Sequence, residues 1–149
     1  MLTELKTVAE GLGITLVILE SDKAIDNQLN RIARIEQLPI MLSSWDLDVA
    51  LEFDENGWLK NPTVDVTLLL VTKANTLEKA NLELEAENMG KLFIQFIKNL
   101  KDYLVLNTNV KQNPITGISF TYVPSFGASK HSGVLGNFKV QQNLDINAC

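Results

Sequence analysis

The chain is poor in cysteine, histidine and proline. Its 149 residues include one Cys, one His and four Pro. Cys149 stands alone at the last position, so it cannot complete an internal disulfide or a cysteine-based zinc site. A chain of this length buries well over half of its unfolded surface and can therefore build a core without such crosslinks. We expect one domain over residues 1–149, with Cys149 as a spectator thiol.

Basic residues and long apolar runs are also scarce. The chain has thirteen Lys and Arg and eighteen Asp and Glu, which gives a formal net charge of −5. Affinity for a phosphate backbone comes mainly from clustered Lys and Arg, so this balance argues against a general nucleic-acid binder. The longest apolar runs, residues 14–19 and 68–71, are far shorter than the roughly 20 residues of a membrane-spanning helix. Residues 1–6 do not read as a secretion signal, and we expect intracellular synthesis and no membrane partner.

Alternation of acidic and apolar residues is the clearest pattern that is present. The acidic positions are Asp46, Asp48, Glu52 and Asp54, and the apolar ones are Leu47, Val49, Leu51 and Phe53. A period of two predicts a strand over residues 45–54, with one face buried and the other acidic. The dipeptide Asn56-Gly57 predicts a turn toward a second strand.

Other patterns predict the remaining elements. We expect helices over residues 2–12 and 21–35, strands over 14–20 and 63–72, an extended segment over 38–43, a long helix over about 76–103, and a closing hairpin of residues 115–123 and 134–144. The long helix has its acidic residues early and Lys98 and Lys101 late, which suits the helix dipole. This order predicts an α+β fold in which a mainly antiparallel sheet packs against the long helix, with further helices at the N-terminus.

No motif in the chain announces a reaction. The carboxylates of residues 46–55 could form a calcium or magnesium site. A flat strand does not wrap its ligands around an ion, however, so an acidic face in contact with solvent is the simpler interpretation. His131 is expected in a surface loop. Ser125, Ser129 or Ser132 near it would be the candidate nucleophiles, yet no nucleophile elbow accompanies them. Gly127, Gly133 and Gly136 are interpreted as turn residues. We therefore expect no enzyme, no cofactor and no metal.

The order of elements resembles that of phage tail terminator and tail completion proteins, which join head and tail. The resemblance covers most of the chain. The segments that look like strands of this family are residues 62–68, Pro-Thr-Val-Asp-Val-Thr-Leu, and residues 133–140, Gly-Val-Leu-Gly-Asn-Phe-Lys-Val. The strand-like residues 14–20 and the helix expected after them fit that family less well.

The resemblance implies a non-enzymatic structural protein that caps the tail tube and joins it to the head connector. It implies a ring of identical subunits, for which a hexamer is one possible form. It also implies that the protein is in the host cytoplasm during assembly and then in the virion tail. Tail tube protein and head connector protein would be its partners. DNA would pass through the ring without specific binding.

Residues can be assigned to this role as hypotheses. An acidic lumen formed by Asp46, Asp48, Glu52 and Asp54 would repel passing DNA. The subunit interface is expected at Trp45, Leu69, Val71 and Phe126, because tryptophan is enriched at interfaces and the second face of residues 63–72 turns apolar partway along. The alternatives are a small intracellular module that holds a peptide or apolar ligand between sheet and long helix, and, ranked last, a metal-dependent enzyme.

Overall fold

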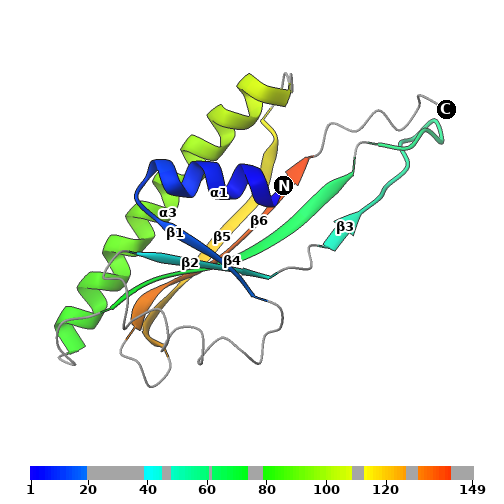
Figure 1. The fold of residues 1–149 in the computed structure, drawn as a ribbon. Coiled ribbons are helices and arrows are strands. Elements are labelled where there is room, and N and C mark those ends of the chain that lie inside the picture. The colour runs from blue at the N-terminus through cyan, green and yellow to red at the C-terminus, as the bar shows by residue number, and fades with distance from the viewer. Residues whose placement is uncertain are drawn as a thin grey trace.

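The protein is an α+β domain, and the part of the chain that the structure describes forms one mixed sheet with two helices on the same face (Figure 1). The computed structural model describes residues 1–19, 39–44, 48–60, 62–73, 79–108, 113–126 and 131–141. The elements, in chain order, are α1 (Leu2–Gly11), β1 (Thr15–Leu19), β2 (Ile40–Ser44), β3 (Asp48–Ala50), β4 (Thr63–Lys73), α3 (Lys79–Thr108), β5 (Ile115–Phe126) and β6 (His131–Gln141). The α+β class expected from the sequence is confirmed.

The sheet has the strand order β1-β2-β4-β6-β5, and β3 pairs with β4 outside this path. Its longest pairing joins β4 and β6 in antiparallel register from Thr63↔Gln141 to Lys73↔His131. β1 and β2 are parallel, so the sheet is mixed, while the other pairs are antiparallel. β2 and β3 pair with different parts of β4, β2 with residues 68–71 and β3 with residues 63–65. β3 therefore lies next to the beginning of β4.

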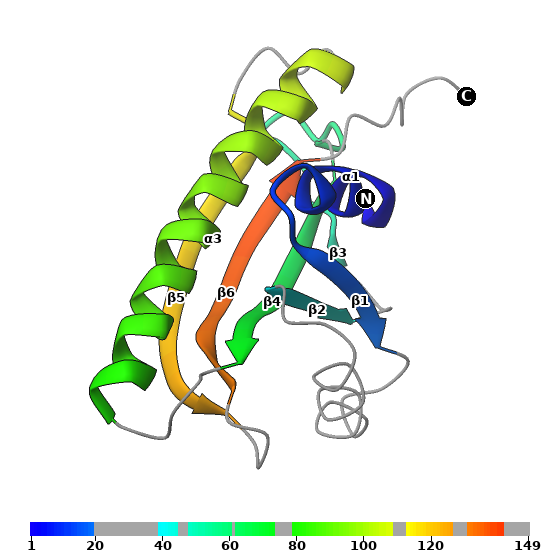
Figure 2. The same cartoon turned by 60° about the vertical axis from the view of Figure 1, so that its left-hand side comes forward.

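α1 and α3 follow the three-and-four spacing of their apolar residues. Leu5, Val8 and Ala9 form the buried stripe of α1, which ends before Gly13 with its φ of +74°. The buried residues of α3 that pack in the main core are Met89, Phe93, Phe96, Ile97, Leu100 and Leu104. Figure 2 shows α3 running along β5 and β6. The long helix expected over about residues 76–103 is thus present, with its described part at residues 79–108.

The two faces of β4 bury different clusters. Val64, Val66, Leu68 and Leu70 face the helices and belong to the main core. On the other face, Leu69 and Val71 pack with Ile40 and Leu42 of β2 in a second, smaller cluster. Alternation along one strand therefore places apolar side chains on both sides of the sheet. The helix expected over residues 21–35 lies outside the described residues.

Two glycines expected in turns lie within strand β6. A Cβ on Gly133 would overlap the carbonyl oxygen of Leu70, and a Cβ on Gly136 would overlap the ring of Phe93. The turn interpretation was wrong for both. The absence of a side chain at Gly133 allows the backbone of β4 to lie close to β6, and its absence at Gly136 leaves space for an aromatic ring from α3. Gly127 lies outside the described residues.

Candidate interaction surface

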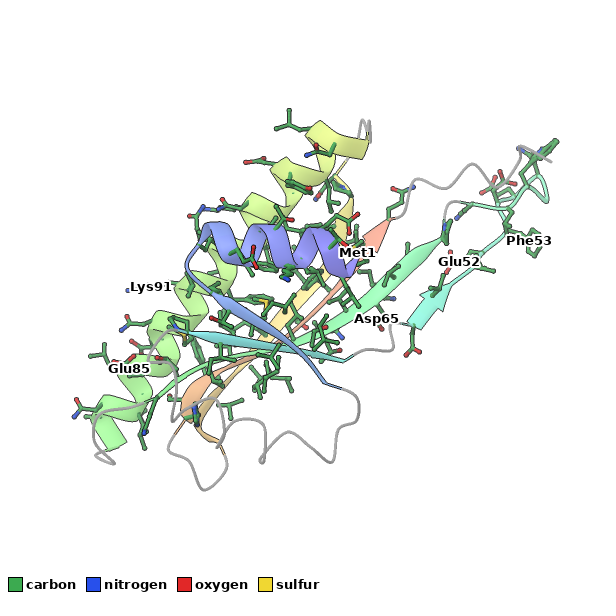
Figure 3. All side chains as sticks on the ribbon, in the orientation of Figure 1. Met1, Glu52, Phe53, Asp65, Glu85 and Lys91 are labelled. Carbon is green, nitrogen blue, oxygen red and sulfur yellow. The ribbon has the colours of Figure 1, made fainter. Side chains whose placement is uncertain are left out.

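Residues 48–60 form a β-hairpin that projects from the sheet, and we call it the arm. Its first strand begins as β3, which pairs with β4 at Asp48↔Asp65, Val49↔Val64 and Ala50↔Thr63. Farther out, Lys60 N–H donates to the Glu52 carbonyl at 2.8 Å, and Phe53 forms a bridge with Leu59. Figure 3 shows Phe53 near the outer end of the arm. The arm is thus a two-stranded extension beyond the layer that the helices cover.

The tip of the arm is a well-defined turn centred on Asp54. Its carboxylate Oδ1 accepts from the backbone N–H of Asn56 at 2.9 Å and of Trp58 at 2.8 Å. The Asp54 carbonyl accepts from Gly57 N–H at 3.0 Å, and Asp54 N–H donates to the Trp58 carbonyl at 2.8 Å. Gly57 has a φ of +80°, the left-handed residue that closes a three-residue hairpin loop. The turn predicted at Asn56-Gly57 is confirmed.

Four large apolar side chains of the arm are exposed. Val49 is 56% exposed, Leu51 61%, Phe53 71% and Trp58 65%. The prediction of one buried face for a continuous strand over residues 45–54 was therefore wrong. Its described part contains only β3 and the outer bridge at Phe53, and the arm extends past the beginning of β4, where no described helix covers it (Figure 1). Alternation predicts that side chains separate onto two faces but not what covers each face.

The acidic positions of the predicted lumen face have different surroundings. Asp48 is exposed and lies directly opposite Asp65, which sequence reasoning did not assign to the acidic face. Glu52 Oε2 lies 3.9 Å from Lys60 Nζ, with both side chains exposed. The Asp54 carboxylate is occupied by the hairpin turn. Asp46 lies outside the described residues, and the acidic lumen stays a prediction.

A groove lies between α3 and the edge strand β5. Its lining residues are Phe93, Ile94, Ile97, Lys98, Ile118 and Phe120, and its volume is about 150 Å³. Phe93 is fully buried at its floor, whereas Ile94 and Ile118 are 44% and 48% exposed. The alternative interpretation of the sequence placed an apolar-ligand site between the sheet and the long helix, but it named no residues, because residues 93–98 have the pattern of an ordinary amphipathic helix and the tertiary fold sets the position of residues 118–120 beside them.

Of the residues predicted for a subunit interface, Leu69 and Val71 lie apart from the arm and the groove. Leu69 and Val71 are buried within a single chain, in the smaller cluster with Ile40 and Leu42. Phe126 is the last residue of β5, and its side chain lies outside the described part. Trp45 also lies outside the described residues. A subunit contact at these positions stays a prediction.

His131 is buried in the first position of β6, opposite Lys73 of β4. The expected surface loop position was wrong, because the strand begins earlier than the apolar pattern indicates. Burial lowers the pKa of the His131 imidazole, and the positive charge of Lys73 lowers it further. The neighbouring Ser132 is also buried, and its hydroxyl donates to the Leu82 carbonyl of α3 at 2.5 Å. Ser132 therefore has a structural partner that fastens the helix to the sheet.

We expect His131 to make stability depend on pH. Because its pKa is lowered in the folded chain, the unfolded chain binds more protons once the pH falls below about 6.5. Stability from this group is therefore complete above that pH and is lost as the pH falls toward the folded-state pKa. Urea unfolding of the wild type and His131→Gln at pH 7.5 and 5.5 measures the effect. The wild type should lose more stability than the variant, and equal losses would contradict the role of His131.

Within the described ranges, no three His, Cys, Asp or Glu side chains lie together as a metal site would require. None of the helices in the described part of the chain combines the length and apolar character needed to cross a membrane. Comparison of the chain with family models, curated proteins and solved structures found no match.

Proposed function

We propose that this protein is a non-enzymatic structural subunit of a phage or prophage tail. As a ring it would cap the tail tube and join it to the head connector, acting in the host cytoplasm during assembly and then in the virion tail. The observation that carries this proposal is the arm, which holds four large apolar side chains outside the folded layers. Apolar side chains gathered on an exposed surface mark sites of protein association.

The order of helices and strands supports a tail protein rather than another kind of self-associating protein. The chain has the N-terminal helix, the central strand, the long helix and the closing hairpin on which the resemblance to tail terminator proteins rests. The acidic residues of the arm suit a ring through which DNA passes, since carboxylates repel phosphates. Asp48 and Glu52 are exposed and carry that charge.

Deletion of the gene from the phage or prophage tests this function. We expect lysates that contain heads and tails but few joined particles when viewed by electron microscopy, and a plasmid copy should restore joining. The DNA flanking the gene should encode connector, tube and tape-measure proteins. Normal virions after deletion, together with unrelated metabolic or regulatory neighbours, would contradict a role in the tail.

The groove favours a second candidate function, a small binding module for a peptide or apolar ligand. Its lining is apolar apart from Lys98, and an apolar concavity with one or two polar groups is typical of ligand sites. This candidate differs from the first in one measurable respect. A binding module works as a single chain, whereas a tail ring requires the chain to associate with itself.

A further inference from the structure

We propose that the arm of one chain docks into the groove of a second copy, with Phe53 or Trp58 entering the groove between α3 and β5. This inference rests on the proposed ring and identifies the two surfaces that would build it. Both surfaces belong to the same chain but lie in different places, so each copy can bind one neighbour with its arm and another with its groove. Five features of the structure support the pairing.

The arm is already in a binding-ready conformation. The Asp54 carboxylate and the backbone hydrogen bonds of the tip close the hairpin, and the pairing of β3 with β4 holds its base. A segment that is ordered before binding loses less conformational freedom when it docks. The exposed rings of Phe53 and Trp58 are therefore suitable anchors, since aromatic side chains provide much of the binding energy of protein interfaces.

The groove has the size and the lining for an aromatic ring. Its volume is about 150 Å³, and an apolar cavity of that volume accommodates benzene. Its floor is rigid because the Phe93 ring packs against Phe120, with centroids 5.6 Å apart, and against Phe138, 6.3 Å away. A preformed apolar floor between two partly exposed isoleucines is suited to an inserted aromatic side chain.

The charges of the two surfaces are complementary. The arm, residues 48–60, contains four acidic residues, Asp48, Glu52, Asp54 and Glu55, and one basic residue, Lys60. The helix α3 has four basic and four acidic residues in all, and its stretch of residues 88–101, which includes the groove, has three basic residues, Lys91, Lys98 and Lys101, between Glu87 and Asp102. Lys98 itself lines the groove. Opposite charges around an apolar contact steer the partners together and fix their orientation.

The edge strand beside the groove carries no charge. β5 is the last strand in the sheet order, and its 12 residues include no charged side chain. Exposed edge strands in soluble proteins usually carry charges or proline that discourage pairing with other chains. Pro124 lies near the end of β5, and the pairing with β6 shifts register between Thr116 and Ser119, so proline and an irregularity limit edge pairing there, while Ile118 and Phe120 give the groove an uncharged apolar wall.

The arm and the groove of one chain are too far apart to meet. β3 lies on one side of β4, whereas β6 and then β5 follow on the other, so three strand spacings of about 4.8 Å separate β3 from β5. The arm also extends away from α3, and Figure 3 places Phe53 and Lys91 at opposite sides of the molecule. The contact must therefore be between copies. Such head-to-tail contacts produce a closed ring when the rotation closes.

The experiment uses the full chain with two classes of variant. The arm variant is Phe53→Ser with Trp58→Ser, and the groove variant is Ile94→Glu with Ile118→Glu. All four side chains are at least 44% exposed, so folding should be retained and is checked by circular dichroism. The control is Leu106→Ser, which removes an exposed leucine of α3 outside the groove. Molar mass is measured by light scattering over a range of concentrations.

We expect the wild type and Leu106→Ser to form the same oligomer, and each double variant to be monomeric, with association weakened at least about 30-fold. An equimolar mixture of the two double variants should give a dimer and nothing larger, because one intact arm meets one intact groove. A wild type that stays monomeric at all concentrations, variants that still assemble, or a mixture that stays monomeric would overturn the proposal.

These outcomes are separate from those that test the tail function. Oligomers that survive both double variants would refute the arm-and-groove contact but leave the tail ring in place, built on another surface. Normal virions after gene deletion would refute the tail function while the masses in solution still report on the contact. The two failures are therefore distinguishable.

Discussion

Gly133→Ala is expected to destabilise the fold severely. The added methyl group would overlap the carbonyl oxygen of Leu70 and lie 2.8 Å from both the Leu70 carbonyl carbon and Val71 Cα. These are backbone atoms of β4, so no side-chain rotation relieves the overlap. β6 lies between β4 and β5, and Gly133 is paired with Val71 on one side and Val123 on the other. Moving β6 away would break pairing in the middle of the sheet.

The expected cost exceeds about 4 kcal/mol, a large part of the roughly 5–15 kcal/mol that stabilises a typical domain. Circular dichroism and urea unfolding of purified protein measure it. The matched control is Gly11→Ala in α1, where a Cβ meets nothing within 4 Å. Alanine there should leave stability unchanged or raise it by up to about 1 kcal/mol. A Gly133→Ala protein as stable as the Gly11→Ala protein would contradict the close approach of β6 to β4.

The elements that sequence predicted well are those whose pattern and surroundings agree. α3 has apolar residues at helical spacing, and the face they form is the one that packs on the sheet. In β4, alternate residues face the main core, as predicted, whereas the apolar positions Leu69 and Val71 of its second face, interpreted from the sequence as a subunit interface, pack with β2 of the same chain. Local periodicity is enough when a neighbouring element covers the face that the pattern marks as apolar.

The arm shows where that reasoning stops. Its alternation is as regular as that of β4, but Val49, Leu51 and Phe53 have no described element above them and remain exposed. Sequence reasoning identified the acidic positions and the turn, and it did not identify the apolar positions as a surface. The residues of the groove were not predicted for a related reason, although a ligand site between the sheet and the long helix was one of the alternatives: Ile94 and Ile118 are distant in the sequence and meet only because α3 packs along β5.

Phe93 and Gly136 are expected to be strongly coupled in stability. The Phe93 ring is fully buried, and a Cβ at Gly136 would overlap its edge. Gly136→Ala should therefore cost about 1–3 kcal/mol, because Phe120 and Phe138 keep the ring from moving aside. Phe93→Ala should cost about 3–5 kcal/mol by leaving a cavity. In the double variant the methyl group added by Gly136→Ala enters the space that the Phe93 ring has left. Gly136→Ala should therefore cost little stability when Phe93 is already alanine.

Urea unfolding of the wild type, both single variants and the double variant gives the coupling directly. We expect the double variant to be more stable than the sum of the single effects by about 1–3 kcal/mol. Phe93→Ala combined with Gly11→Ala is the control pair, and its effects should add, since a Cβ at Gly11 has no neighbour within 4 Å. Additive effects of the substitutions at Phe93 and Gly136 on stability would mean that the Phe93 ring does not pack against Gly136. Coupling would establish that the sheet holds the Phe93 ring, the floor of the groove, in place. A groove that binds the arm of a second chain requires such a fixed floor.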